Sequence, residues 1–204
     1  MIFSGWGQKS DVINISSVSS NNIEYIDYLS FPSIGLVADI VKDKNPDIII
    51  GWSLGGQIAI NCILKELITT KLLILLGVPF QFLSQNSYQI GINNKIYQAF
   101  CNDLFKNPKN LLKKFHLMMI QGDKRFSDLK NKTFYSQNFN NLQYWLDYLV
   151  SFSGFDINFN NLCQTELIYG KNDNIVNYRQ GKLFHKYIPN SNLSIIDNYS
   201  HILF

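Results

Sequence analysis

Residues 47–60 read DIIIGWSLGGQIAI, and this stretch decides the fold. An apolar run ends at Gly51 and a helical pattern follows Leu54, which predicts a buried strand, a tight turn and a helix. The turn contains the pattern G-x-S-x-G, in which Ser53 is held on a sharp, strained bend that exposes its hydroxyl. An ordinary glycine-rich connection or a phosphate-binding turn is the alternative, but phosphate loops require other glycine spacings. A nucleophilic Ser53 is therefore the better interpretation.

The rest of the chain alternates short apolar runs with helical patterns. Strands are predicted at 47–51, 72–76, 167–169 and 193–196, with weaker candidates at 2–3 and 23–28. Helices are predicted at 34–44, 54–67 and 178–187. Apolar strands separated by helices are typical of a parallel sheet that is covered on both faces. We therefore predict an α/β fold with about six mostly parallel strands.

One long segment interrupts this alternation. Three helices, over 96–105, 111–120 and 142–152, are predicted where strand signals are absent. Such an insertion usually crosses the carboxyl edge of the sheet, where ligands bind. The sequence thus predicts a core formed by residues 1–80 and 160–204, and a helical cap formed by residues 81–159.

The charge of this cap is uneven. Residues 106–132 contain eight basic and two acidic side chains, a balance of +6, whereas the whole chain carries only +3. Most such runs are simply solvated helix surfaces. Because this one lies over a predicted active site, an acidic partner is a second interpretation.

Composition excludes several classes of protein. Apolar residues make up 46% and charged residues 16%, which fits a globular core and not a disordered chain. A net charge of +3 is too small to indicate a nucleic-acid binder, and no apolar run approaches the ~20 residues of a membrane span. Three widely spaced cysteines match no metal site and no disulfide framework. With no signal peptide evident at the start, we expect a cytoplasmic protein with reduced thiols.

A serine nucleophile needs a base and an orienting acid, which follow it along the chain in this kind of fold. The base is predicted to be His201, which lies in a loop after a strand, whereas His185 lies within a helical pattern. The acid is predicted to be Asp173, which also follows a strand. Asp197 ranks second. The acids of the insertion, Asp147 and Asp156, are weaker candidates.

An oxyanion hole requires two backbone N–H groups that point at the developing negative charge. Leu54, directly after the serine, is expected to supply one of them. The other is expected from Trp6, because Ser4-Gly5-Trp6-Gly7 follows a short strand and its small residues permit close approach.

Taken together, these residues resemble the α/β-hydrolases, and among them the pimeloyl-acyl-carrier-protein methyl ester esterases of biotin synthesis. The likeness lies in Gly5-Trp6-Gly7, in the serine turn, in Tyr169-Gly170 with Asp173 and Val176, and in the late His201. It extends into the cap, from Phe115 to Gly122. The resemblance implies a substrate-binding helix face and a carrier-protein docking surface on the cap. The implied substrate contacts are Trp6, Phe115, His116, Leu117, Met118 and Met119. The implied docking residues are Lys109, Lys113, Lys114, Lys124 and Arg125.

The resemblance implies hydrolysis of the methyl ester of pimeloyl-acyl-carrier protein by a serine carboxylesterase that uses no metal or organic cofactor. The expected partner is the acyl carrier protein, with no nucleic acid and no membrane, and the expected state is a monomer. A general short-chain carboxylesterase or thioesterase is one alternative. A non-catalytic acyl-carrier-binding protein on the same fold is another.

Overall fold

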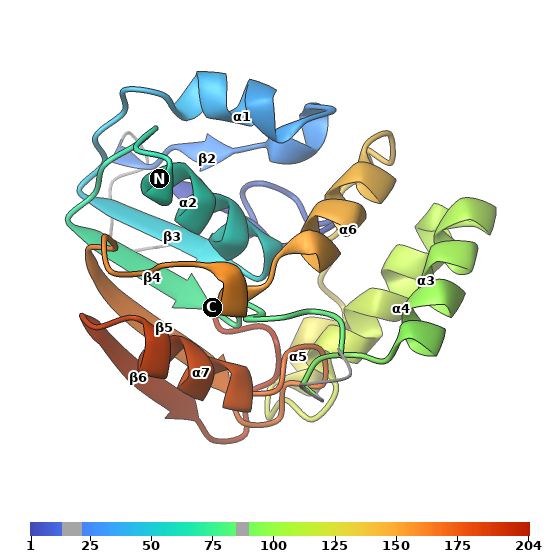
Figure 1. Cartoon of the computed structure of the whole chain (residues 1–204). Coiled ribbons are helices and arrows are strands. Elements are labelled where there is room, and N and C mark those ends of the chain that lie inside the picture. The colour runs from blue at the N-terminus through green and yellow to red at the C-terminus, as the bar shows by residue number, and fades with distance from the viewer. Residues whose placement is uncertain (14–21, 85–89) are drawn as a thin grey trace.

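The computed structural model describes residues 1–13, 22–84 and 90–204. Within these ranges, six strands form one sheet in the order β2-β1-β3-β4-β5-β6, and every neighbouring pair is parallel (Figure 1). The strands are β1 (Ile2–Phe3), β2 (Tyr25–Ile26), β3 (Ile48–Trp52), β4 (Leu72–Leu76), β5 (Gln164–Gly170) and β6 (Ser191–Ile196). The predicted α/β class and the predicted strands are confirmed.

One face of the sheet is covered by helices α1 (Ile34–Val41), α2 (Leu54–Leu64) and α7 (Arg179–Tyr187) (Figure 1). Leu75 and Leu167, which are register partners on this face, are fully buried. On the opposite face Ile48 is 43% exposed and its neighbours Ile50 and Ile74 are only half-buried. The expectation of helices on both faces was therefore wrong for the part of the chain described here.

The insertion between β4 and β5 contains helices α3 (Asn94–Lys106), α4 (Pro108–Ile120), α5 (Phe126–Lys130) and α6 (Leu142–Ser151). Three of these match predicted helices, and the short α5 was not predicted. Asparagine side chains cap the N-termini of the two longest helices, α3 and α4. The side chain of Asn93 accepts a hydrogen bond from the N–H of Ile96, and that of Asn107 accepts one from the N–H of Asn110, each at 3.0 Å. Figure 1 shows α3 and α4 side by side, with α6 between them and the sheet.

Helix α6 is packed on the core. The ring of Trp145 is fully buried, lies 4.8 Å from that of Tyr28, and donates from Nε1 to the carbonyl of Phe31 at 3.0 Å. The hydroxyl of Tyr144 accepts a hydrogen bond from the N–H of Ile34 at 2.8 Å. These contacts anchor the end of the insertion to the segment that leads into α1 and to the first residue of that helix.

In the described ranges, no helix is both long and apolar enough to cross a membrane.

Candidate active site

Ser53 stands between the end of β3 and the start of α2, and its backbone is strained. It has φ 52° and ψ −123°, a conformation that non-glycine residues rarely adopt. The flanking glycines make this turn possible. A Cβ at Gly55 would lie 2.3 Å from the carbonyl oxygen of Phe3, and one at Gly51 would lie 2.4 Å from Gly56 Cα. The serine is thus held at the carboxyl edge of the sheet in a turn so tightly packed that positions 51 and 55 must be glycine.

Two loops at the same edge bring the predicted acid and base together. Asp173 lies after β5 and His201 after β6, and Asp173 Oδ2 is 2.6 Å from His201 Nδ1. The other carboxylate oxygen, Oδ1, accepts the N–H groups of Ile175 and Val176, each at 2.8 Å. His201 is 1% exposed, so this contact is shielded from water. An acid held in this way orients the imidazole and fixes which nitrogen carries the proton.

The loop that carries His201, residues 197–204, also contacts β3, the strand that leads into the serine turn. Trp52, directly before Ser53, donates from Nε1 to the carbonyl oxygen of His201 at 3.0 Å, and their rings lie 5.5 Å apart. A Cβ at Gly77, which follows β4, would lie 3.2 Å from His201 Nδ1. Among the described residues, no hydrogen bond joins Ser53 Oγ to the His201 ring. Such contacts are often formed only once substrate is bound.

The backbone N–H groups of Trp6 and Leu54 lie at this edge, and neither has a hydrogen-bond partner in the described parts of the chain. Leu54 is the first residue of α2, where the helix has no acceptor for its N–H and carries a partial positive charge. Trp6 is anchored by its indole, which donates to the carbonyl of Leu142 at 2.9 Å. Both N–H groups therefore stay the predicted oxyanion donors.

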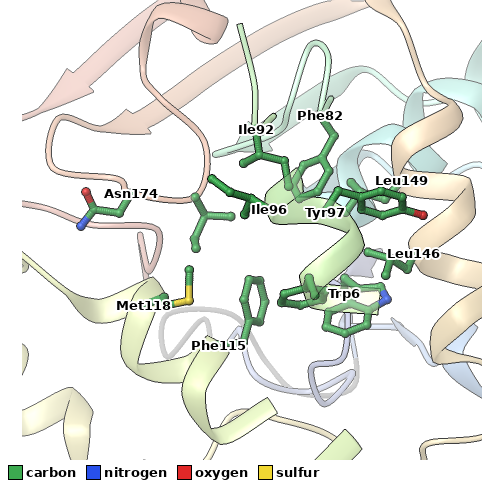
Figure 2. Close-up of a pocket in the computed structure, with 12 residues that line it drawn as sticks. Trp6, Phe82, Ile92, Ile96, Tyr97, Phe115, Met118, Leu146, Leu149 and Asn174 are labelled. Carbon is green, nitrogen blue, oxygen red and sulfur yellow. The ribbon is translucent and has the colours of Figure 1, made fainter. Parts of the chain in front are cut away.

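A narrow apolar cavity lies between the cap and this edge (Figure 2). Rings from three segments form one wall, since the centroids of Phe100 and Phe115 lie 5.3 and 5.6 Å from that of Trp6. Ile175 also lines the cavity, and its N–H donates to the carboxylate of Asp173. The cavity therefore lies beside the loop that carries Asp173. The full lining is Trp6, Phe82, Ile92, Ile96, Tyr97, Phe100, Phe115, Met118, Leu146, Leu149, Asn174 and Ile175.

Only some of the predicted substrate contacts line this cavity. Phe115, Met118 and Trp6 do. His116, Leu117 and Met119 do not. Successive helical residues point about 100° apart, which turns His116 and Leu117 away from the side of Phe115. His116 is buried on another side of α4, where its Nε2 lies 3.2 Å from the carbonyl of Leu129. Leu117 is 45% exposed, and Met119 is buried in the core.

Sequence reasoning did not single out most of the lining residues. The signal was present as helical spacing: Ile96 and Phe100 are four residues apart on α3, and Leu146 and Leu149 are three apart on α6. Periodicity identifies an apolar face but not what that face contacts. Figure 2 shows that Ile96, Leu146 and Leu149 extend from separate elements toward one space, with the amide of Asn174 directed away from it.

The predicted docking residues divide into two groups. Four of them are exposed: Lys109, Lys113, Lys114 and Lys124. Lys114 forms an exposed ion pair with Asp103, with 3.5 Å between Nζ and Oδ2. Arg125 is different, because its donors are used internally, on Asp123 and on the carbonyls of Ile202 and Phe204. Most of its guanidinium N–H groups are therefore already used within the chain, unlike those of the lysines.

The alternative acids and base lie elsewhere. Asp197 faces Lys171 at 2.7 Å on the surface, and Asp156 is exposed. Asp147 accepts from the hydroxyl of Tyr97 at 3.1 Å. His185 is exposed and lies 3.0 Å from Ser191 Oγ. Asp173 is the carboxylate that contacts His201.

Comparison with known proteins accounts for this arrangement. A model of the α/β-hydrolase fold family matches residues 34–204. This chain is an α/β hydrolase. Two solved hydrolases share its fold. An esterase from Exiguobacterium antarcticum has a TM-score of 0.65 at 20% identity, covering 77% of this chain and 60% of its own. A hydrolase from Oleispira antarctica has a TM-score of 0.66 at 13% identity, covering 98% and 82%.

Two curated relatives of this α/β hydrolase are called pimeloyl-[acyl-carrier protein] methyl ester esterase. The protein from Nitrosospira multiformis is 31% identical over 88 residues, which are 43% of this chain and 34% of the relative. The protein from Pseudoalteromonas atlantica is 27% identical over 137 residues, which are 60% of this chain and 53% of the relative. The chain thus spans about a third to a half of the length of the relatives it matches.

Proposed function

We propose that this α/β hydrolase is a serine carboxylesterase that cleaves the methyl ester of pimeloyl-acyl-carrier protein, releasing methanol. The observation that carries the proposal is the buried contact of 2.6 Å between Asp173 and His201, on loops at the sheet edge where the strained Ser53 stands. The names of the two curated relatives support the choice of substrate.

The proposed reaction begins with Asp173 holding His201 by its Nδ1–H. Nε2 is then left as the acceptor that takes the proton of the Ser53 hydroxyl as its oxygen attacks the ester carbonyl. The N–H groups of Trp6 and Leu54 are proposed to bind the oxyanion that forms, a contribution of roughly 3–4 kcal/mol per donor in comparable sites. His201 returns the proton to the leaving methoxide. A water molecule, activated by the same imidazole, then releases the acid from Ser53.

The apolar cavity supports an acyl chain as the bound group. Its wall of Trp6, Phe100 and Phe115 would bury methylene groups, each worth about 0.8 kcal/mol. Met118 lines the cavity yet is 44% exposed, so it marks a place where the cavity meets solvent. The unbranched Met side chain adapts well to flexible chains.

We propose that the acyl carrier protein docks on the exposed lysines Lys109, Lys113, Lys114 and Lys124. Lys114 precedes Met118 by four residues and thus lies on the same side of α4. Carrier proteins offer acidic surfaces, and a basic rim would mainly raise the association rate. Arg125 is left out of this surface because its donors are engaged within the chain.

A salt series separates this function from that of a general short-chain esterase or thioesterase. Cleavage of the carrier-linked ester should fall steeply between low salt and ~0.5 M, where charges are screened within a few ångströms. Cleavage of a small p-nitrophenyl ester should change little. Equal insensitivity of both substrates would remove the carrier protein from the proposal.

Catalysis itself is tested with Ser53→Ala. This variant should lose ester hydrolysis and labelling by a fluorophosphonate probe, whereas the wild type retains both. If the variant kept full activity, the hydrolysis would come from a contaminating enzyme, and the non-catalytic acyl-carrier-binding alternative would be favoured. The biological role is tested by growth without biotin of a cell that lacks its own esterase, with Ser53→Ala as the negative control.

A further inference from the structure

The end of α4 and the turn that follows it contact both of the loops that carry the predicted acid and base. On the base side, the carbonyl of Met119 accepts the N–H of His201 itself at 3.1 Å, and Lys124 donates its N–H to the carbonyl of Asn198 at 2.8 Å. On the acid side, Asn172 and Asn174, the two neighbours of Asp173, also reach this turn. Their side-chain amides donate to the carbonyls of Gly122 and Gln121, at 2.8 and 3.2 Å. We call residues 119–125 the cap turn.

Asp123 is the centre of this contact. Its carboxylate is fully buried, and its Oδ2 accepts both the N–H and the hydroxyl of Ser200, at 3.0 and 2.8 Å. Ser200 directly precedes His201. The carboxylate thus binds the residue next to the predicted base, although Asp123 and Ser200 are 77 positions apart in the sequence.

Arg125 closes the arrangement. Its Nε donates to Asp123 Oδ1 at 3.0 Å, and Nη1 donates to the carbonyl of Phe204 at 2.9 Å, while Nη2 reaches the carbonyl of Ile202. The guanidinium also lies 4.2 Å from the centre of the Tyr199 ring. One side chain therefore contacts the chain on both sides of His201.

These contacts matter because residues 197–204 form no helix or strand of their own. A catalytic base must be held to within about 0.5 Å of its working position. Asp123 stays charged at neutral pH: burial raises the pKa of its carboxyl, but hydrogen bonds from Arg125 and Ser200 outweigh this and lower the pKa to about 2.

We propose that Asp123 and Arg125 are positioning residues that hold the His201 loop in register with Asp173. In this view the cap turn is a fixed part of the active site, not a lid that lifts away from it. The inference rests on the proposed hydrolase function and adds a role that acts only through His201.

The test compares Asp123→Asn and Arg125→Ala with Asp128→Asn. Asp128 is an exposed carboxylate only five residues from Asp123, with no side-chain partner among the described residues, so it controls for the loss of one charge. A displacement of ~1 Å in a catalytic group costs up to about 100-fold in rate. We expect kcat for a p-nitrophenyl ester, per folded molecule, to fall roughly 10- to 100-fold in the first two variants. KM should stay within about twofold, and Asp128→Asn should match the wild type.

Chemical rescue separates positioning from general stability. Millimolar guanidinium should partly restore kcat in Arg125→Ala but not in Ser53→Ala, because only the former has a vacant site for the ion. Arg125→Lys should be intermediate, since one ammonium cannot serve all of the acceptors. If both variants keep the wild-type kcat, or lose activity only in proportion to the unfolded fraction, the inference is wrong.

The wild type distinguishes this failure from that of the proposed function. If wild-type protein neither hydrolyses esters nor reacts with a fluorophosphonate, the hydrolase proposal fails first. If wild type reacts and Asp123→Asn reacts at the same rate, the hydrolase proposal stands and the positioning role is overturned.

Discussion

Trp52 Nε1 lies 3.0 Å from the backbone carbonyl oxygen of His201, so the strand that leads into the serine turn holds the loop that carries the base. The two residues are 149 positions apart in the chain. Trp52 is fully buried, and its ring also meets that of Phe204 edge-on at 5.0 Å. One side chain therefore joins the serine turn to His201 itself and to the chain that follows it.

Replacing Trp52 with Phe removes the indole N–H and leaves the buried carbonyl of His201 without this hydrogen-bond donor. We expect a loss of about 1–3 kcal/mol in the free energy of unfolding, together with a fall of roughly tenfold in kcat per folded molecule. Trp145→Phe is the matched control, because it removes a 3.0 Å indole bond to Phe31 far from the base loop. It should lower stability alone, as measured by denaturant titration. Equal effects of both variants on kcat would contradict the link.

Gly77 leaves room for the acid–base pair. A Cβ at this position would lie 3.2 Å from His201 Nδ1 and 3.4 Å from Asp173 Oδ2, and the residue has φ 52°. Gly77→Ala should therefore displace the pair and reduce kcat by at least about tenfold. Gly35→Ala, on α1, meets nothing closer than 3.8 Å and should instead raise stability by about 0.5–1 kcal/mol with kcat unchanged. Steady-state kinetics on both proteins decides this.

The cavity should determine which acyl chains are accepted. Phe115→Ala removes a lining ring and should lower kcat/KM for a long-chain p-nitrophenyl ester by roughly 5- to 30-fold, equivalent to about 1–2 kcal/mol of apolar contact. The effect on the acetate ester should be small, since its acyl group is short. Leu117→Ala, two residues further on and 45% exposed, should leave both esters unaffected. A loss in Leu117→Ala instead would favour the contact expected from sequence.

His116 should make stability depend on pH. Burial lowers the pKa of its imidazole below the usual value of 6.5, although the nearby carbonyl of Leu129 opposes this. The unfolded chain therefore binds a proton more readily, so this contribution to stability is present above about 6.5 and is lost as the pH falls from there through the lower pKa of the folded state. In His116→Gln, the difference in unfolding free energy between pH 7 and pH 5 should shrink relative to the wild type. An unchanged difference in denaturant titrations at the two pH values would refute this.

The fold could be predicted from local patterns because its elements are marked locally. Residues 72–76 are apolar throughout and form β4 with the predicted bounds. The serine turn is marked by glycines that exclude a Cβ, which is a property of a few adjacent residues. The order of serine, acid and histidine, each after a strand, pointed to Asp173 and His201, which the structure brings into contact.

What only the tertiary structure decided concerns contacts between residues distant in sequence. The sequence marked Arg125 as one of a run of basic residues, yet its partners Ile202 and Phe204 lie more than 75 positions away. Helical spacing in α4 could not reveal that Phe115 faces the cavity while His116 faces Leu129. The physical reason is the same in each case. Hydrophobic periodicity indicates which side chains are buried, whereas the packing of separate elements determines which residues those side chains contact.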